Sequence, residues 1–263
     1  IDRVAKSGRI GNLASGNEYD EPYDKLLLAP GAAAIRPDLP GCDLPELQVL
    51  RDLGDMDRIK RIVDQGIERA IVLGGGFIGL ELVENLVQRG VATTLIERSS
   101  QLLGPFDPEM TTPLLHALNE HQVDVRLDRS VVRFEQDDCG VAVHLESGEV
   151  VRGQLVVLGV GVRPENRLAI EAGLEVGPRG GICVDETMRT SDPHIYAAGD
   201  AIETRDDVTG VPAQLPLAGP ANRQGRLAAD AIFGRPVRFR GTQGTAILGL
   251  FGRTAAMTGL SEK

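Results

Sequence analysis

A run of glycines between an apolar segment and an amphipathic one constrains this chain more than any other feature. The apolar segment, residues 70–73, has the length and composition of a parallel strand that is covered on both faces. Gly74, Gly76 and Gly79 follow at once in the spacing G-x-G-x-x-G, and apolar residues then recur with helical periodicity as far as Gly90. A strand, a glycine turn and a helix in this order predict a dinucleotide-binding unit of the α/β class.

Each position of the glycine loop has its own expected task. Gly74 permits the tight turn, Gly76 lets a pyrophosphate approach the backbone, and Gly79 lets the helix pack closely on the strand. The helix that begins at Phe77 and Ile78 offers free N–H groups and a partial positive charge to the diphosphate. We therefore expect these residues to bind a nicotinamide dinucleotide.

An acidic residue follows the second strand, residues 92–96, at the place where such units contact the adenosine ribose. Glu97 lies 18 residues beyond Gly79 (97 − 79 = 18). Its carboxylate can accept hydrogen bonds from both ribose hydroxyls and would repel a 2′-phosphate, which favours NADH over NADPH. The neighbouring Arg98 leaves NADPH open as an alternative, because a guanidinium can hold a 2′-phosphate.

The remaining chain reads as short strands and a few helices. After a weakly patterned segment at 1–22, which is compatible with a β-meander, a strand is expected at 23–29. Further strands are expected at 123–127, 131–134, 141–145, 155–158, 182–184, 194–198, 244–250 and 254–257, and helices at 55–65, 107–121 and 219–233. Asp107 is the expected N-cap of the second helix, with Pro108 at its first position.

Composition excludes several classes of function. The net charge of −10 makes nucleic acid and anionic membranes poor partners, and no apolar run reaches the length of a membrane span. The three cysteines, Cys42, Cys139 and Cys183, are scattered and predict no disulfide framework, which suits a reducing cytoplasm. The four histidines have no metal-site spacing, so no metal is expected.

Four stretches together resemble a known family. They are residues 23–32, 73–81, 190–200 and 215–226, and they are similar to the pyridine nucleotide–disulfide oxidoreductases, most closely the branch of coenzyme A-disulfide reductases and NADH oxidases. The resemblance implies a Rossmann-like FAD/NAD(P)-binding fold in three layers, with a parallel sheet, a β-meander and a nucleotide domain inserted into an interrupted flavin domain. It implies FAD and NAD(P)H as cofactors.

The resemblance also assigns roles to individual residues. Glu81 inherits a place near the nicotinamide and flavin rings; the alternative is an acid that merely complements the helix dipole. Gly159 and Gly161 join the residues expected to contact NAD(P)H. The expected FAD contacts are Ala29, Pro30, Gly31, Gly199, Asp200, Leu217, Ala218 and Gly219.

The same resemblance predicts the domain organisation. Residues 1–46 and 160–235 are expected to form flavin-domain segments, 47–159 the NAD(P)H-binding domain, and 236–263 the start of a dimerisation domain. We expect a segment of a longer protein, since the first nucleotide loop of the family and its redox-active cysteine would precede Ile1.

The leading hypothesis is a flavin-dependent oxidoreductase, homodimeric as a whole protein. It would pass a hydride from NAD(P)H to FAD, and electrons on to a disulfide such as coenzyme A disulfide or to oxygen or peroxide. The chain alone is expected to bind nicotinamide nucleotide better than FAD and not to turn over. Two alternatives remain: a non-catalytic nucleotide-binding module, and a flavin-free Rossmann dehydrogenase.

Overall fold

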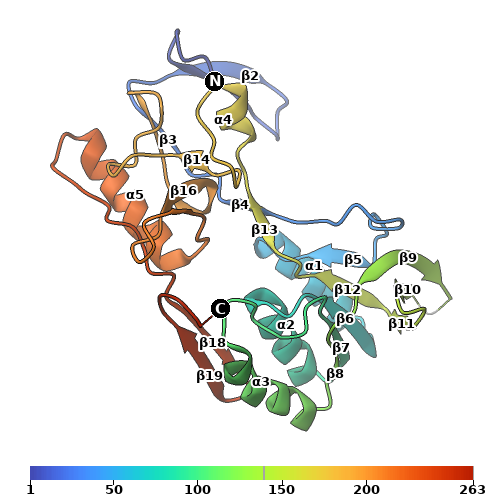
Figure 1. Cartoon of the computed structure of the whole chain (residues 1–263). Coiled ribbons are helices and arrows are strands. Elements are labelled where there is room, and N and C mark those ends of the chain that lie inside the picture. The colour runs from blue at the N-terminus through green and yellow to red at the C-terminus, as the bar shows by residue number, and fades with distance from the viewer. Residues whose placement is uncertain (139, 263) are drawn as a thin grey trace. The chain divides into compact units, whose positions relative to one another are not determined.

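The structure, a computed structural model, describes residues 1–138 and 140–262, so Cys139 lies outside the described residues. The chain forms two compact units, each made of two separate stretches (Figure 1). Unit 1 comprises Ile1–Ala33 and Arg163–Thr245, and unit 2 comprises Ala34–Val162 and Ala246–Lys263. The glycine loop belongs to unit 2, whose larger stretch interrupts the sequence of unit 1. Which cofactor each unit holds stays a prediction.

Unit 2 is built on a parallel sheet of five strands. Their spatial order is β5 (Leu47–Val49), β12 (Leu155–Leu158), β6 (Arg69–Leu73), β7 (Ala92–Ile96) and β8 (Asp124–Arg126). All neighbouring pairs are parallel. The chain runs outward from β6 to β7 and β8 and then returns to β12 on the other side of β6, so the strand order reverses between β6 and β12. Ligands of open α/β sheets bind at the carboxyl ends of the strands beside such a reversal.

Alternate residues of the central strand enter two different cores. Ala70 and Val72 belong to the cluster formed with helices α1 (Leu53–Asp64), α2 (Phe77–Gln88) and α3 (Pro108–Glu120). Ile71 and Leu73 belong to the cluster formed with the antiparallel sheet β9 (Val131–Asp137), β10 (Gly140–Leu145) and β11 (Val150–Gly153). Because successive side chains point to opposite faces of a strand, unit 2 has three layers. The predicted α/β class, parallel sheet and meander are confirmed.

The C-terminal hairpin completes the helical side of unit 2. Strands β18 (Ala246–Leu250) and β19 (Arg253–Met257) pair antiparallel and contribute Leu248 and Leu250 to the core shared with α2 and α3 (Figure 1). The ring of Phe251, at the hairpin turn, stacks on His121 with 3.9 Å between ring centroids. The backbone N–H of Phe251 donates to Glu84 of α2 at 2.9 Å.

The expected helices begin within two residues of the predicted positions, but their N-caps are not always formed as expected. Helix α1 begins two residues earlier than expected, because Asp52 is its N-cap and forms a capping box with Asp55. Asp107 does occupy the N-cap position of α3, but its side chain makes no capping hydrogen bond. That carboxylate instead accepts the backbone N–H of Glu262 at 2.9 Å, so the predicted N-cap position of Asp107 is confirmed, without a capping bond from its side chain.

Unit 1 contains several small sheets around one core. The hairpin β1 (Ser7–Gly11) and β2 (Glu18–Pro22) is antiparallel, whereas β3 (Leu26–Leu28) and β15 (Ile195–Ala197) pair parallel. Strands β14 (Ile182–Cys183), β16 (Ile202–Arg205) and β17 (Pro212–Ala213) form a third sheet. Helices α4 (Arg167–Glu171) and α5 (Ala218–Ile232) complete the unit, with Ala169 and Ala228 in its core.

Some short elements escaped the sequence analysis. Helix α4 has five residues, too few for a helical period to show, and it lies in a stretch that reads as a polar crossing. Strand β11 is also missing from the expectations, since Arg152 and Gly153 weaken its apolar pattern. The paired segments β4 (Ala32–Ala34) and β13 (Val162–Pro164), where the chain passes between the units, were likewise not expected.

Candidate functional site

The glycine loop of unit 2 lies at the reversal of the strand order, where β6 and β12 end side by side. Gly74 follows β6 with φ of 103°, a conformation that only glycine adopts readily. A Cβ built on Gly74 would lie 2.3 Å from the carbonyl oxygen of Gly159, which follows β12. The two expected coenzyme-binding turns are therefore in contact, and Gly74 is required for that contact.

The other two glycines of the motif face different surroundings. A Cβ on Gly79 would lie 1.9 Å from the carbonyl oxygen of Gly74, so Gly79 lets α2 pack on the loop. Around Gly76, in contrast, no heavy atom lies within 4 Å of an added Cβ. Gly76 is the N-cap of α2 and supplies no side-chain capping bond. Open space beside an uncapped helix N-terminus fits a diphosphate.

The remaining expected NAD(P)H contacts surround this turn. The ring of Phe77 lies 6.2 Å from that of Phe106, and Ile78 in the first turn of α2 is 39% exposed. Arg98 is exposed next to Glu97. Gly161 has φ of 112°, and its carbonyl accepts the backbone N–H of Ile35 at 3.0 Å.

Glu97 follows β7 directly, and both of its carboxylate oxygens accept backbone hydrogen bonds. Oε2 accepts the N–H of Gly75, and Oε1 accepts the N–H of Ser99, each at 2.7 Å. A carboxylate oxygen has two acceptor sites, so each retains one for a ribose hydroxyl. The acidic residue of the motif, Glu97, is thus hydrogen-bonded directly to the glycine loop.

Glu81 lies on the second turn of α2, and its side chain is exposed. The first turn of α2 contains no acidic residue, because the helix begins at Phe77. Complementarity to the helix dipole acts within the first turn. The dipole alternative for Glu81 is therefore wrong, while its expected place near the two rings stays a prediction.

The expected FAD segments of unit 1 meet where β3 and β15 end. The backbone N–H of Ala198 donates to the carbonyl of Leu28 at 3.0 Å, which brings the segments 29–31 and 199–200 beside each other. Gly31 has φ of 74° with no atom near an added Cβ, and its carbonyl accepts the N–H of Glu165 at 3.0 Å. The space beside Gly31 is therefore open, as a bound nucleotide would require.

Helix α5 joins this group through the segment that follows β15. The N–H of Gly199 donates to Oε1 of the buried Gln224 at 2.9 Å, and a Cβ on Gly199 would contact Ala221. Leu217 is the N-cap of α5, which has no side-chain capping bond, and Ala218 and Gly219 open the helix in an exposed position. The N-terminus of α5 can thus receive a group with negative charge.

Asp200 stands in the short 3₁₀ turn η1 (Gly199–Ala201) next to these residues. Burial raises the pKa of its carboxyl above the ordinary value. Among the described residues, no group donates a hydrogen bond to this half-buried carboxylate. A half-buried acid without a donor in the protein keeps its acceptor sites free for a ligand, so Asp200 fits a hydroxyl-bearing group such as the ribityl chain of FAD.

The described cysteines, Cys42 and Cys183, are both partly buried. Burial, followed by the nearby charges of Glu175 and Glu203, raises the pKa of the Cys183 thiol. A raised pKa lowers the thiolate fraction and hence the nucleophilicity. Cys42 is partly buried against the core between the parallel sheet and the meander.

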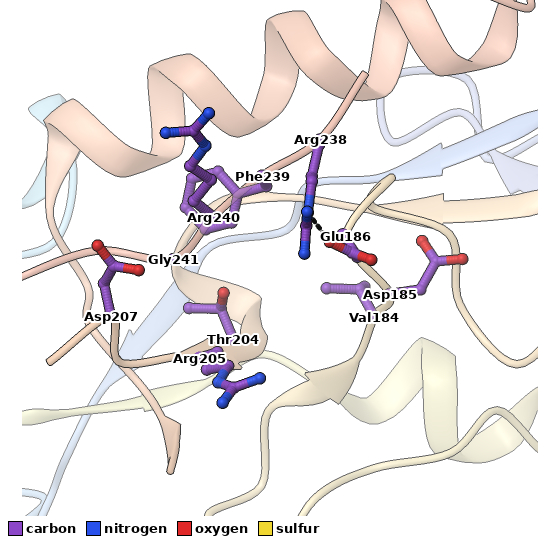
Figure 2. A pocket seen from close by; sticks show the side chains of 10 residues that line it. All are labelled: Val184, Asp185, Glu186, Thr204, Arg205, Asp207, Arg238, Phe239, Arg240 and Gly241. Atoms are coloured by element: carbon purple, nitrogen blue, oxygen red, sulfur yellow. Dashed lines mark hydrogen bonds and ion pairs between the residues drawn. The ribbon is translucent and has the colours of Figure 1, made fainter. Parts of the chain in front are cut away.

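Unit 1 also has a cavity that the expected FAD contacts do not line. It has a volume of about 590 Å³ and is lined by residues 184–186, 204, 205, 207 and 238–241 (Figure 2). Its arginines and acids are mixed, and Arg238 forms an ion pair with Glu186. Mixed, exposed charges of this kind give no focused potential for an anion.

The part of the chain that the structure describes contains neither a cluster of metal ligands nor a helix that could span a membrane. No group of three or more potential metal ligands occurs among those residues. None of their helices combines the length and the apolar character needed to cross a bilayer.

Sequence reasoning missed the residues that support the two sites. Gly75, Leu102 and Leu103 fix the glycine loop, and the apolar pair 102–103 directly after the polar segment 98–101 is the signal that could have found them. Gln224 was also missed. Its spacing from Ala221 and Ala228, three and four residues away, indicates the buried face of α5.

The family model of the pyridine nucleotide-disulphide oxidoreductases matches residues 1–225. The chain therefore belongs to the pyridine nucleotide-disulphide oxidoreductase family, and the resemblance expected from the sequence is confirmed.

Individual relatives place it near enzymes of coenzyme A and sulfur chemistry. The chain is 35% identical over 258 residues to an NAD(P)H sulfur oxidoreductase (CoA-dependent) of Pyrococcus abyssi, covering 97% of this chain and 57% of that protein. It is 31% identical over 251 residues to a coenzyme A disulfide reductase of Staphylococcus aureus, covering 95% and 56%. The crystal structure of reduced Bacillus anthracis CoADR-RHD superposes with a TM-score of 0.96 at 43% identity, covering 100% of this chain and 47% of that one. The chain thus spans about half the length of the relatives it matches.

Proposed function

We propose that the protein containing this chain is a flavin-dependent NAD(P)H oxidoreductase that reduces a disulfide or persulfide of the coenzyme A type. Two nucleotide-type sites in one chain carry this proposal. Unit 2 holds a glycine loop at the reversal of its parallel sheet, and unit 1 gathers the turn at Gly31, the acid Asp200 and the N-terminus of α5. A flavin-free dehydrogenase needs only the first site.

The residues present fit both cofactors. In unit 2, the open space at Gly76 and the N-terminus of α2 would receive the diphosphate of NAD(P)H, and Glu97 the adenosine ribose. In unit 1, Asp200 would accept hydroxyl hydrogen bonds, and the α5 N-terminus would favour negative charge on the ring system. When bound, FAD supplies the two-electron chemistry that connects hydride transfer to a second acceptor.

NADH is the preferred coenzyme in this proposal. Glu97 retains acceptor sites for ribose hydroxyls, and its negative charge opposes a 2′-phosphate. Arg98, which is exposed at the next position, supports a residual affinity for NADPH.

The acceptor follows from the chemistry of the relatives and from the cysteines. The relatives are named for sulfur and coenzyme A disulfide chemistry. The Cys183 thiol has a raised pKa and Cys42 is partly buried, so the reactive thiol would be supplied from outside the described residues. We further propose a homodimer in the cytoplasm, where free thiols persist.

The test is anaerobic reduction of the whole purified protein that contains this chain. After incubation with FAD, the protein should carry flavin absorbance that bleaches on addition of NADH, and coenzyme A disulfide should restore it. Catalytic consumption of NADH with oxygen, and none with coenzyme A disulfide, would identify an oxidase of the same family. Colourless protein that binds NADH would indicate the nucleotide-binding module for this chain. NAD-linked oxidation of a small alcohol or acid without flavin would indicate the dehydrogenase.

A further inference from the structure

The middle glycine of the loop, Gly75, is held on both sides by the segment that follows β7. Its backbone N–H donates to Oε2 of Glu97 at 2.7 Å. Its carbonyl accepts the backbone N–H of Leu103 at 2.9 Å. A Cβ built on Gly75 would lie 2.6 Å from Cδ2 of Leu102, so the leucine side chain closes the space beside it. Both polar groups of this peptide are therefore satisfied within the protein.

The two groups that hold Gly75 are themselves fixed. The backbone N–H of Glu97 donates to the carbonyl of Arg126 at 2.9 Å, and its carbonyl accepts the backbone N–H of Arg129 at 3.0 Å. Its second carboxylate oxygen accepts the N–H of Ser99 at 2.7 Å. Glu97 is thus fixed by the segment that follows β7, by the last residue of β8 and by the segment after β8. The hydrogen bond from Gly75 then joins the glycine loop to this fixed position.

Leu103 adopts a strained backbone conformation at the point of contact. Its φ is 46°, in the left-handed region that a branched side chain avoids, and its side chain is 1% exposed. Such strain persists only where surrounding structure imposes it, and it is common at functional sites. Here the strained conformation accompanies the hydrogen bond from the Leu103 N–H to Gly75, while the side chain fills the core shared with α2 and α3.

We propose that Glu97 and Leu103 are positioning residues that hold the Gly75 peptide and so fix the shape of the coenzyme loop before coenzyme binds. The proposal rests on the function proposed above and gives Glu97 a role besides contact with the ribose. A residue that only reads the ribose changes the affinity for coenzymes that carry the hydroxyl it contacts. A residue that shapes the loop changes the affinity for every coenzyme that uses the diphosphate site.

Coenzyme analogues separate the two roles. The dissociation constants of NADH, NADPH and 2′,3′-dideoxy-NADH, whose adenosine ribose lacks both hydroxyls, are measured for the wild type, Glu97→Gln and Glu97→Ala. Loss of the loop contact should weaken NADH and 2′,3′-dideoxy-NADH by about tenfold in Glu97→Ala, and NADPH by less, because the same change removes the repulsion of the 2′-phosphate. Glu97→Gln should be intermediate for 2′,3′-dideoxy-NADH, since its single carbonyl oxygen can still accept one of the two N–H groups. If 2′,3′-dideoxy-NADH binds the wild type and Glu97→Ala equally, the positioning role is overturned.

Hydrogen exchange of the Gly75 amide tests the same proposal without coenzyme. Exchange in the ligand-free chain should be faster in Glu97→Ala than in the wild type and unchanged in Glu84→Gln. Glu84 is a matched control because it is another glutamate of unit 2 that accepts a backbone N–H, that of Phe251. Equal exchange in the wild type and Glu97→Ala would refute the proposal. If the wild type bound none of the three coenzymes, the proposed function would fail while this measurement still tested the positioning role.

Leu103 has its own pair of variants. Leu103→Val should speed exchange at Gly75 and weaken all three coenzymes, because a β-branched residue resists positive φ. Leu118→Val removes the same volume from the same core in a helical position, and its side chain is fully buried in the wild type. Leu118→Val should leave the exchange rate of the Gly75 amide and the coenzyme affinities unchanged, although it lowers the free energy of unfolding by a similar amount. Equal effects of the two variants would assign Leu103 to packing alone.

Discussion

The two proposed nucleotide sites differ in how many of their groups make contacts and hydrogen bonds within the protein. In unit 2, the glycine loop is closed by internal contacts, with Gly74 against Gly159, Gly79 against Gly74, and Gly75 hydrogen-bonded on both sides. In unit 1, the turn at Gly31 is open and the carboxylate of Asp200 has no donor among the described residues. The proposed NAD(P)H site is therefore fixed by contacts within the protein, whereas the proposed FAD site keeps acceptor groups that the protein does not use.

The difference teaches that one sequence signal can describe two physical situations. A glycine at a strand end can be required by the protein's own packing, as at Gly74, or can leave room for a ligand, as at Gly76. Variants at these positions therefore affect either the folded chain or the bound coenzyme. Four variants, in order of decreasing effect, test this division.

Gly74→Ala should have the largest effect. A side chain at φ of 103° is strained, and its Cβ would lie 2.3 Å from a backbone oxygen. We expect a loss of about 3 kcal/mol or more in the free energy of unfolding. Urea denaturation measures it, with Gly66→Ala as the control. Gly66 also has positive φ but no neighbour near an added Cβ, so its substitution should cost only about 1–2 kcal/mol. Equal losses would show that the loop contact is unimportant.

Gly76→Ala should separate binding from stability. Its φ of −84° and ψ of −173° suit any residue, and the space around it is empty. The free energy of unfolding should change by no more than about 0.5 kcal/mol. Affinity for NADH should fall by about tenfold or more, because the methyl group would occupy the path of the diphosphate. Calorimetric titration and denaturation on the same sample check both, and unchanged NADH affinity would contradict the site.

Asp200→Asn should weaken FAD binding and stabilise the unliganded chain. We expect about a tenfold loss of FAD affinity in a flavin fluorescence titration. Because burial raises the folded-state pKa of Asp200, the free energy of unfolding falls as pH rises from the ordinary carboxyl range through the folded-state pKa.

Asparagine has no such dependence. The advantage of the variant in thermal unfolding without FAD should therefore be larger at pH 7 than at pH 3. An equal or reversed difference between the two pH values would show that Asp200 carries no desolvation cost.

Phe251→Ala should have the smallest effect, and it tests a residue that lies outside the glycine loop. It removes the stacking on His121 that holds the C-terminal hairpin against α3. The expected loss of stability is about 1 kcal/mol. Binding of NADH should not change, because the hairpin contributes no residue to the glycine loop. A matching loss of NADH affinity would mean that the hairpin supports the coenzyme site.

The sequence predicted what local periodicity and spacing determine. Strand β6, helix α2 and the order of Gly74, Gly76 and Gly79 follow from apolar patterns and turn chemistry within a short window. The support of Gly75 by Leu103 did not follow. It joins residues 28 positions apart (103 − 75 = 28) through a hydrogen bond between backbone groups, which no residue type in the sequence indicates. The partner of the Asp107 carboxylate did not follow either, because the N–H of Glu262 that it accepts lies 155 residues away.

The contacts between the expected flavin segments of unit 1 could not be predicted from the sequence either. The positions of Asp200 and Gly31 could be named from sequence motifs, but their meeting at the ends of β3 and β15 depends on a pairing between strands 169 residues apart, for Leu26 and Ile195 (195 − 26 = 169). Long-range pairing of this kind carries no local pattern.

The central claim is that a preformed glycine loop in unit 2 binds the nicotinamide coenzyme. The most direct measurement is a titration of the ¹⁵N-labelled chain with NADH, followed by backbone amide chemical shifts. The account predicts saturable shifts concentrated at Gly74–Gly79 and at Glu97–Ser99. Saturable binding that leaves these amides unchanged, with shifts instead around the cavity lined by Arg238 and Arg240, would contradict it.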